Sequence, residues 1–225
     1  PNSAIIGAPD TRVPYFEQAL FAFYRNNIIP AVRNIGGLGI ISDKGILNLS
    51  IVMNKPKDNF SINEGYELMT SFIKAIFPEG ADKIEAVEIA NSYCPGDYDL
   101  SIDGKKFAGI AQRKIKEAVV VSIYISIFGD QQKRANIMKD FYEIGIDDQE
   151  VRYKYPKVDP ECMETLENLL NKKFTLEDVF ERVEKVLYGL DCDLEKGEYT
   201  EAMVEEYNEI FEQAKERNES YLEGK

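Results

Sequence analysis

The feature that most restricts the fold of this chain is a β-rich centre whose strands follow one another through tight turns. Residues 97–102 alternate between polar and apolar side chains, Asp103-Gly104 is a typical hairpin pair, and residues 105–114 return along it. Residues 117–128 then form a long run rich in β-branched side chains, which predicts a central, buried strand. Strands joined by such short turns pair antiparallel, so the sequence predicts a mainly antiparallel core sheet.

Helices and shorter strands surround this centre. The further strands are predicted at residues 3–8, 28–34, 38–42, 46–53 and 83–91. Helices are predicted at residues 13–27, 61–76, 130–144 and from 159 onward, ending in a long acidic helix from 199 to about 223. The predicted fold class is therefore α+β: a mixed, mainly antiparallel sheet domain over residues 1–158, with a helical C-terminal segment over residues 159–225 packed on it. No strand leads into a glycine-rich Rossmann or P-loop turn, which argues against a doubly wound nucleotide fold.

The charge of the chain excludes several classes of partner. It has 27 Lys and Arg against 40 Asp and Glu, a net charge of −13. A nucleic-acid binder needs a positive field, and so does a protein that docks on an anionic membrane, so neither partner is expected. Most of the acidity lies near the C-terminus, whereas residues 104–157 carry more basic than acidic side chains. That mildly basic middle segment suits docking of an acidic protein, or is simply a solvated face.

The chain has no histidine and three cysteines, Cys94, Cys162 and Cys192. The missing histidine excludes Ser-His-Asp and Cys-His catalysis and any zinc site that uses histidine. Three widely spaced cysteines form neither a disulfide framework nor a paired metal motif, so no metal is expected. Together with the absence of an apolar run long enough to span a membrane, this predicts reduced thiols in a cytoplasmic protein.

The first stretch that can carry chemistry surrounds Cys94. Pro95-Gly96 fixes a turn directly after this cysteine, a position that exposes a thiol more readily than an apolar stripe does. Across the predicted hairpin, Lys105 and Lys106 return, and adjacent strand residues face opposite sides, so one of the two points inward. A cation beside Cys94 favours the nucleophilic thiolate and stabilises an oxyanion on a substrate carbonyl. The alternatives are a small buried cysteine and two solvated lysines.

The second stretch, residues 32–48, contains closely spaced glycines. Gly36-Gly37, with Gly39 close behind, lets backbone approach a ligand without a Cβ clash and presents backbone N–H groups. Arg33 just before them can anchor a carboxylate or a neighbouring loop. The alternative interpretation is a flexible turn between two strands.

These two stretches together resemble the signature regions of the biotin/lipoate protein ligase and octanoyltransferase superfamily. They read VRNIGGLGIISDKGILN and DYDLSIDGKKFAGIAQRK. Four further segments are similar to one branch, the octanoyl-[glycine cleavage H protein]:protein N-octanoyltransferases, or lipoyl amidotransferases: IIGAPDTRVPYF, SYCPGDYDL, VDPECMETLENLLNKKFTLEDV and ERNESYL. The resemblance runs from about Pro1 to Leu222. It implies a sheet domain like that of biotin ligases and class II synthetases, with further sequence before Pro1.

The resemblance also assigns roles to individual residues. It implies that Cys94 is the acyl-thioester nucleophile and that Lys106 contacts the acyl carbonyl. The substrate-binding residues that it implies are Arg33, Gly36, Gly37, Asp43, Gly109 and Gln112. Two departures from the superfamily pattern stand out: Val32-Arg33 replaces Arg-Arg, and no histidine follows the lysine strand. The general base is therefore not identified.

The activity that the resemblance implies is transfer of an octanoyl or lipoyl group through a cysteine thioester, without a cofactor. The donor would be the glycine cleavage H protein and the acceptors the lipoyl domains of 2-oxo acid dehydrogenases. Residues 38–41 and 119–128 would line an apolar tunnel for the acyl chain, and Arg113, Lys114 and Lys116 would dock the carriers. Two alternatives remain: an ATP- and Mg²⁺-dependent lipoate–protein ligase, which needs no Cys94, and a non-catalytic protein that binds acyl carriers.

Overall fold

The computed structural model describes residues 2–54 and 60–222. The strands are β1 (Ser3–Ile6), β2 (Ile29–Val32), β3 (Ile40–Ser42), β4 (Ile46–Asn54), β5 (Glu85–Ala86), β6 (Leu100–Ile102), β7 (Lys105–Ile115) and β8 (Ala118–Ser126). The helices are α1 (Phe16–Ala19), α2 (Phe21–Tyr24), α3 (Ile62–Ile76), α4 (Gln131–Ile146), α5 (Leu166–Leu169), α6 (Leu176–Tyr188) and α7 (Glu201–Leu222). Short 3₁₀ turns lie at Asp10–Arg12 and Pro160–Cys162.

Two sheets build the body of the molecule. The larger sheet has the strand order β4-β8-β7-β6-β5, and every neighbouring pair is antiparallel. The smaller sheet has the order β2-β1-β3, with β1 parallel to β2 and antiparallel to β3. The predicted α+β class with a mixed, mainly antiparallel arrangement is confirmed, and the β-branched run forms β8 between β4 and β7.

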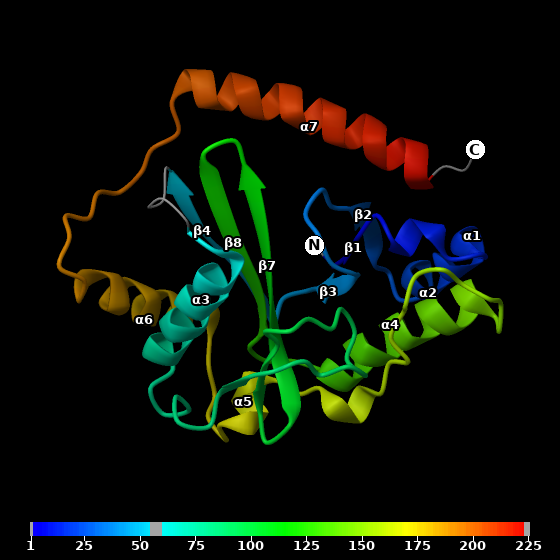
Figure 1. Ribbon diagram of the computed structural model, residues 1–225, viewed down its shortest axis with the longest axis horizontal. Helices are drawn as coiled ribbons and strands as arrows, with labels where there is room; N and C mark the ends of the chain where they lie inside the picture. Colours follow the sequence, from blue (N-terminus) through cyan, green and yellow to red (C-terminus); the bar gives the residue numbers. More distant parts are fainter. Residues whose placement is uncertain (1, 55–59, 223–225) are drawn as a thin grey trace.

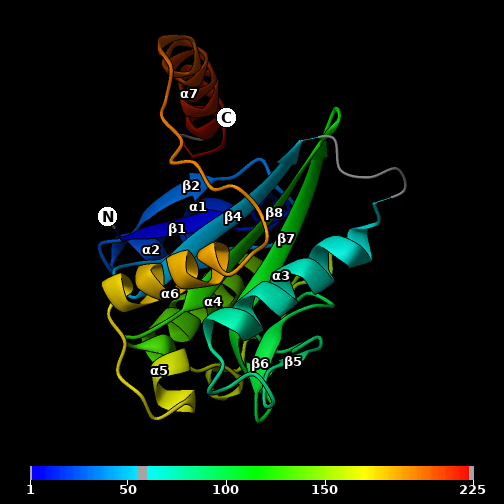
Figure 2. The same ribbon diagram turned by 90° about the vertical axis from the view of Figure 1, so that its left-hand side faces the viewer.

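Helices cover the two sheets separately (Figure 1). Helices α3 and α6 lie against the large sheet, and the view in Figure 2 shows α3 running beside β7. Their apolar residues join one core cluster with β7 and β8. Helices α1, α2 and α4 pack with the small sheet around a second cluster that also contains Tyr93, and Cys94 is packed against it. The Cys94 turn therefore lies where the two parts of the fold meet.

Local sequence signals explain the best predicted helices. Ser61 caps α3 by accepting from the Glu64 N–H, and the Glu64 carboxylate accepts in return from the Ser61 N–H. Thr175 and Asp178 form the same capping box at the start of α6. Asp130 caps α4, which ends within two residues of its predicted end.

Two predicted elements are shorter than the pattern suggested. Residues 13–27 form two single turns, α1 and α2, rather than one helix. The strand predicted at residues 83–91 pairs only over Glu85–Ala86. After Ala86, hydrogen bonds to Asp99 take the place of strand pairing. The Asp99 carbonyl oxygen accepts from the Val87 N–H, and the Asp99 carboxylate accepts from the Ile89 N–H. Backbone groups satisfied by a side chain need no strand partner.

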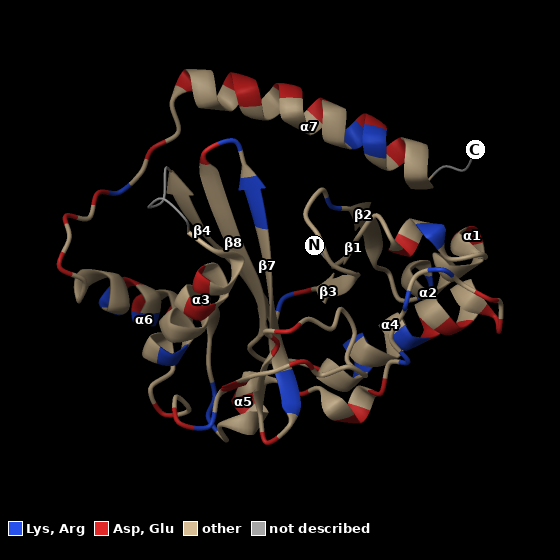
Figure 3. Cartoon of the chain, viewed as in Figure 1, with Lys and Arg blue, Asp and Glu red and all other residues tan. Residues whose placement is uncertain are grey.

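The C-terminal segment divides into two parts. Leu166 of α5 and Val179 of α6 are buried in the core of the large sheet. Helix α7 crosses outside the body and has no buried residue, and Figure 3 shows acidic residues, coloured red, along it. No helix in the described part of the chain is long and apolar enough to cross a membrane. The boundary between residues 158 and 159 stays a prediction.

Candidate active site

The turn at Cys94 brings a thiol to the rim of a cavity of about 300 Å³. Cys94 has a φ of 48°, in the left-handed region, and its side chain is half-buried. Three segments supply most of the lining: the loop with Arg33 and Gly36-Gly37, the turn at residues 94–97, and residues 109–112 of β7. A left-handed cysteine is a strained position that a rigid turn must hold, and such strain gathers at functional sites.

Lys106 holds this turn from behind. Its side chain is fully buried, and its Nζ lies 2.7 Å from the Cys94 carbonyl oxygen and 3.0 Å from the Tyr93 carbonyl oxygen. The same nitrogen reaches Ser92 Oγ at 3.0 Å and a carboxylate oxygen of Asp99 at 2.9 Å. Burial raises the pKa of the Asp99 carboxyl, and the Lys106 ammonium opposes that rise. Lys106 is thus the inward-facing lysine of the pair, and four acceptors share its three N–H groups: Ser92 Oγ, the carbonyl oxygens of Tyr93 and Cys94, and the Asp99 carboxylate.

Arg33 is the cation that approaches the sulfur itself. One guanidinium nitrogen, Nη2, lies 3.6 Å from Cys94 Sγ and donates to the Leu38 carbonyl oxygen at 2.7 Å. A positive group at this distance stabilises a thiolate. The arginine is held in place by its own loop, because Leu38 follows the glycine pair that Arg33 precedes.

The glycine pair has two distinct roles. Gly37 has a φ of 100°, and a Cβ there would lie 2.5 Å from Arg33 Nη2 and 3.3 Å from Cys94 Sγ. Only glycine allows this loop to pass between the guanidinium and the sulfur. A Cβ on Gly36 would meet nothing within 4 Å, so this glycine opens the cavity rather than relieving a clash.

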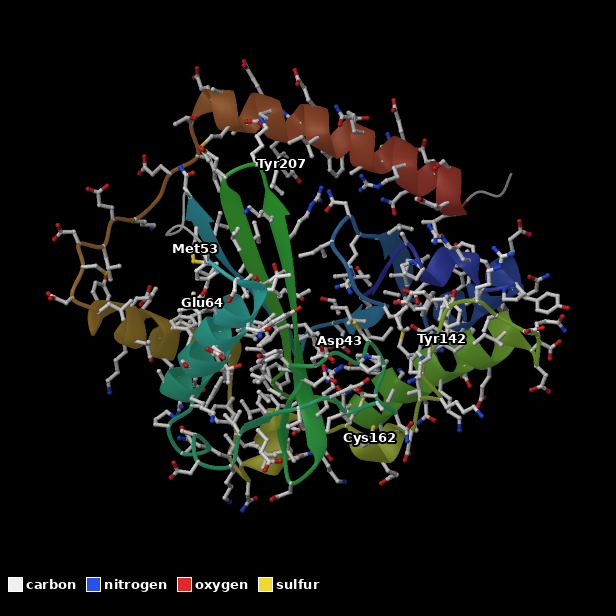
Figure 4. All side chains as sticks on the ribbon, in the orientation of Figure 1. Asp43, Met53, Glu64, Tyr142, Cys162 and Tyr207 are labelled. Carbon is white, nitrogen blue, oxygen red and sulfur yellow. The ribbon has the colours of Figure 1, made fainter. Side chains whose placement is uncertain are left out.

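Most of the predicted site residues meet at this cavity. Arg33, Gly36, Gly37, Cys94, Gly109 and Gln112 line it, and Lys106 lies directly behind the turn. Asp43 is elsewhere: its carboxylate pairs with Arg134 at 2.6 and 2.9 Å, where β3 leads into β4 (Figure 4). Asp43 therefore anchors α4 to the sheets, and a direct substrate contact for it stays a prediction.

The lining differs from the tunnel expected from the sequence. Ile40 and Ile41 are buried in the core of the small sheet, and Leu38 is buried as well. Among the described residues of the segment 119–128, Tyr124 alone lines the cavity. Tyr66, on α3, completes the opposite wall and stacks on Tyr98 with 4.6 Å between ring centroids. The β-branched strand fills the core instead, because its side chains pack against α3 and α6.

No pattern in the sequence points to a buried carboxyl near the loop that contains Gly36 and Gly37. Asp10 is fully buried, accepts from the Gly7 N–H at 2.7 Å and from the Tyr142 hydroxyl at 2.8 Å, and burial raises its pKa to about 6. The sequence clue to this contact is Gly7, because any larger residue would place its Cβ 2.0 Å from the Gly37 carbonyl oxygen. The end of β1 thus supports the glycine-pair loop by direct backbone contact.

In the described part of the chain, the remaining cysteines and the acidic residues form no second site. Burial and the neighbouring Asp159 raise the pKa of the Cys162 thiol to about 11, and Cys192 is exposed in the acidic segment. Among residues 2–54 and 60–222, no three Cys, Asp or Glu side chains gather closely enough to hold a metal ion.

Comparison with known proteins decides the family. The model of the lipoyl protein ligase A/B catalytic domain matches residues 1–188. This chain belongs to that family.

Lipoyl ligase A/B proteins with the curated name octanoyl-[GcvH]:protein N-octanoyltransferase resemble it over nearly its whole length. The one from Lysinibacillus sphaericus is 41% identical over 98% of this chain and 80% of its own length. Those from Oceanobacillus iheyensis and Staphylococcus aureus are 39% and 36% identical, over 97% and 99% of this chain and 78% and 80% of theirs.

Solved structures of lipoate-protein ligases share the fold. A lipoate-protein ligase A bound with ATP superposes with a TM-score of 0.69 at 20% identity, over 94% of this chain and 78% of that one. The bipartite lipoate protein ligase of Thermoplasma acidophilum gives a TM-score of 0.65 at 20% identity, over 94% and 76%. At this identity the likeness establishes the architecture alone.

Proposed function

We propose that this lipoyl ligase A/B protein moves an octanoyl or lipoyl group between protein lysines through a thioester on Cys94. The donor is the glycine cleavage H protein, as in the name of the curated relatives, and the acceptors are lipoyl domains of 2-oxo acid dehydrogenases. One observation supports this above the others: a half-buried thiol lies at the cavity rim with a guanidinium 3.6 Å from its sulfur. That arrangement provides an activated nucleophile without any histidine.

In the first step the Cys94 thiolate attacks the amide carbonyl of the acylated donor lysine. A C–S bond forms, the C–N bond breaks, and the donor nitrogen takes up the proton given by the thiol, so that the lysine leaves as an amine. The Arg33 guanidinium stabilises the thiolate before attack. The resemblance implies that Lys106 contacts the acyl carbonyl, and for that contact Lys106 would exchange one of its bonds to the Cys94 turn.

In the second step a neutral lysine of the acceptor attacks the thioester. A C–N bond forms, the C–S bond breaks, and the proton lost by the attacking amine returns to the sulfur. The thioester retains the acyl-transfer potential that the second step needs, so the proposal requires neither ATP nor a metal. Because an amide is more stable than a thioester, the first step is uphill and the whole exchange is reversible. The mechanism requires a free Cys94 thiol, which fits a reducing, cytoplasmic location.

The carriers would approach along the β7–β8 hairpin. Arg113, Lys114 and Lys116 follow the cavity residues 109–112 on the same strand and in its turn, and Lys114 and Lys116 are exposed. Arg113 also donates to the Asn34 carbonyl oxygen at 2.8 Å, which ties this hairpin to the glycine-pair loop. In Figure 3 this end of β7 is coloured blue for basic residues. An acidic carrier surface is attracted to such a patch.

Intact-protein mass spectrometry tests the thioester. The chain is mixed with octanoylated H protein, and we expect a mass gain of one octanoyl group that hydroxylamine removes. Cys94→Ser should not show the hydroxylamine-sensitive adduct, whereas Cys162→Ser, the matched thiol outside the cavity, should keep it. Full-rate transfer by Cys94→Ser would refute the covalent scheme.

A second assay separates the transferase from the ligase alternative. The chain is incubated with free lipoate, ATP and Mg²⁺ and an unmodified lipoyl domain. We expect no lipoylation from free lipoate, while octanoyl-H protein serves as donor without ATP. Lipoylation that needs ATP and survives in Cys94→Ser would favour the ligase.

A further inference from the structure

A side chain near the C-terminus is bonded to the backbone beside the active site. Asn218 of α7 lies against β2, and both polar atoms of its amide contact Val32. Its Oδ1 accepts from the Val32 N–H at 2.5 Å, and its Nδ2 donates to the Val32 carbonyl oxygen at 3.3 Å. Figure 1 shows the C-terminal part of α7 over β2. The two residues are 186 positions apart in the chain.

The edge of β2 needs such a partner. β2 is the outer strand of the small sheet, and its residues alternate between bonding to β1 and facing the open side. The N–H groups of Ile29 and Arg33 donate to the carbonyl oxygens of Asn2, directly before β1, and of Ile6. The backbone groups of Pro30 and Val32 therefore point to the open edge, although both side chains are buried. Pro30 has no N–H to satisfy, which suits an edge. Val32 has both backbone groups, and the Asn218 amide takes the place of a neighbouring strand.

Val32 is the residue that leads into Arg33. The Arg33 N–H bonds to the Ile6 carbonyl oxygen at 2.9 Å, and from there the side chain extends to the Cys94 sulfur. Fixing Val32 on its outer side therefore fixes the backbone from which the guanidinium starts. A shift of about 1 Å in such a group can cost up to ~100-fold in rate.

We propose that Asn218 is a positioning residue, which acts through Val32 to hold Arg33 against the Cys94 thiol. This inference rests on the proposed function only in taking Cys94 as the nucleophile. A purely structural role explains the contact less well, because α7 has no buried residue and contributes little to either core cluster beyond the partly buried Leu222. The amide is also neutral, so its influence on the thiol is geometric and not electrostatic.

The test measures the reactivity of Cys94 with iodoacetamide at pH 7, by peptide mapping of the full chain. Asn218→Ala should slow alkylation of Cys94 about tenfold, within the range expected for a small displacement of the cation. Asn208→Ala, the same substitution at an exposed position of the same helix, should react like the wild type. Hydrogen exchange of the Val32 amide should accelerate in Asn218→Ala and not in Asn208→Ala.

A double-mutant cycle with Arg33→Gln distinguishes positioning from general loosening. If Asn218 acts through Arg33, then Asn218→Ala should have no further effect on alkylation in the Arg33→Gln background. An equal slowing in both backgrounds would overturn the proposal, and so would wild-type alkylation in Asn218→Ala. If Asn218→Ala does not fold, Asn218→Leu replaces it, because leucine has a similar volume and no charge and removes both hydrogen bonds to Val32. The same two outcomes then decide.

This experiment is independent of the acyl donor. Iodoacetamide reports the thiolate directly, so failure of octanoyl transfer from the H protein would refute the proposed function and leave this inference standing. Conversely, suppose that Asn218→Ala matches the wild type both in the rate of acyl-enzyme formation and in alkylation. That result would exclude Asn218 as a positioning residue and leave the transferase assignment in place.

Discussion

Lys106 donates a hydrogen bond to the carbonyl oxygen of Cys94 at 2.7 Å, and so contacts the backbone of the proposed nucleophile rather than its sulfur. The sulfur has Arg33 beside it instead. Two cations thus contact one cysteine at different atoms, its carbonyl oxygen and its sulfur. One holds the left-handed turn in place from within the protein, and the other reaches the thiol at the cavity.

Replacing Lys106 should cost stability as well as activity. Lys106→Met leaves the Asp99 carboxylate buried without its ion pair, which typically costs about 3–5 kcal/mol. The double variant Lys106→Met/Asp99→Asn should recover much of the free energy of unfolding in urea, because no buried charge is left unpaired. Acyl-enzyme formation should stay low in both. Normal transfer by either variant would remove Lys106 from the mechanism.

The two neighbouring glycines should respond differently to alanine. In Gly37→Ala the new methyl group meets Arg33 and Cys94 at a φ of 100°, so the loop must shift and the guanidinium must leave the sulfur. We expect acyl transfer to fall at least about tenfold. Gly36→Ala places its methyl group in open space and should affect transfer far less. Equal effects of the two variants, measured as kcat/KM, would contradict the role given to Gly37.

Asp10 should make stability depend on pH. Because burial raises its pKa to about 6, the folded chain keeps a proton between pH 4 and 6 that the unfolded chain has released. The stabilisation by neutral Asp10 is complete below about pH 4 and is lost as the pH rises through 6. Relative to Asp10→Asn, the wild type should lose on the order of 3 kcal/mol across that interval. Urea unfolding at several pH values measures the difference, and parallel curves for the two proteins would contradict it.

Reversing a charge on the hairpin should weaken carrier binding and leave the thiol intact. Lys114→Glu should raise KM for the acylated carrier about tenfold at low salt, and the effect should shrink as salt screens the charges. Lys196→Glu, the same change at an exposed position of the acidic segment, serves as the control. Alkylation of Cys94 should be the same in both variants. A KM that does not respond to Lys114→Glu would place the carrier elsewhere.

Local signals in the sequence determined much of the framework. The Asp103-Gly104 turn between β6 and β7, the β-branched run of β8 and the Ser61–Glu64 capping box act over a few residues, so the sequence alone predicts them. The Cys94-Pro95 turn belongs to the same class. The single helix expected at residues 13–27 was wrong, because its apolar spacing fits two packed turns equally well.

Tertiary structure alone decided how the site is assembled. Which cation faces the sulfur, the pairing of Asp43 with Arg134, and the contact of Asn218 with Val32 all join segments from distant parts of the chain. No periodicity or local motif encodes such pairs, because the side chains meet only after both sheets have packed. Local patterns in the sequence thus specify most of the strands, the caps and the reactive turn, while the packing of the two sheets and α7 specifies what surrounds the thiol.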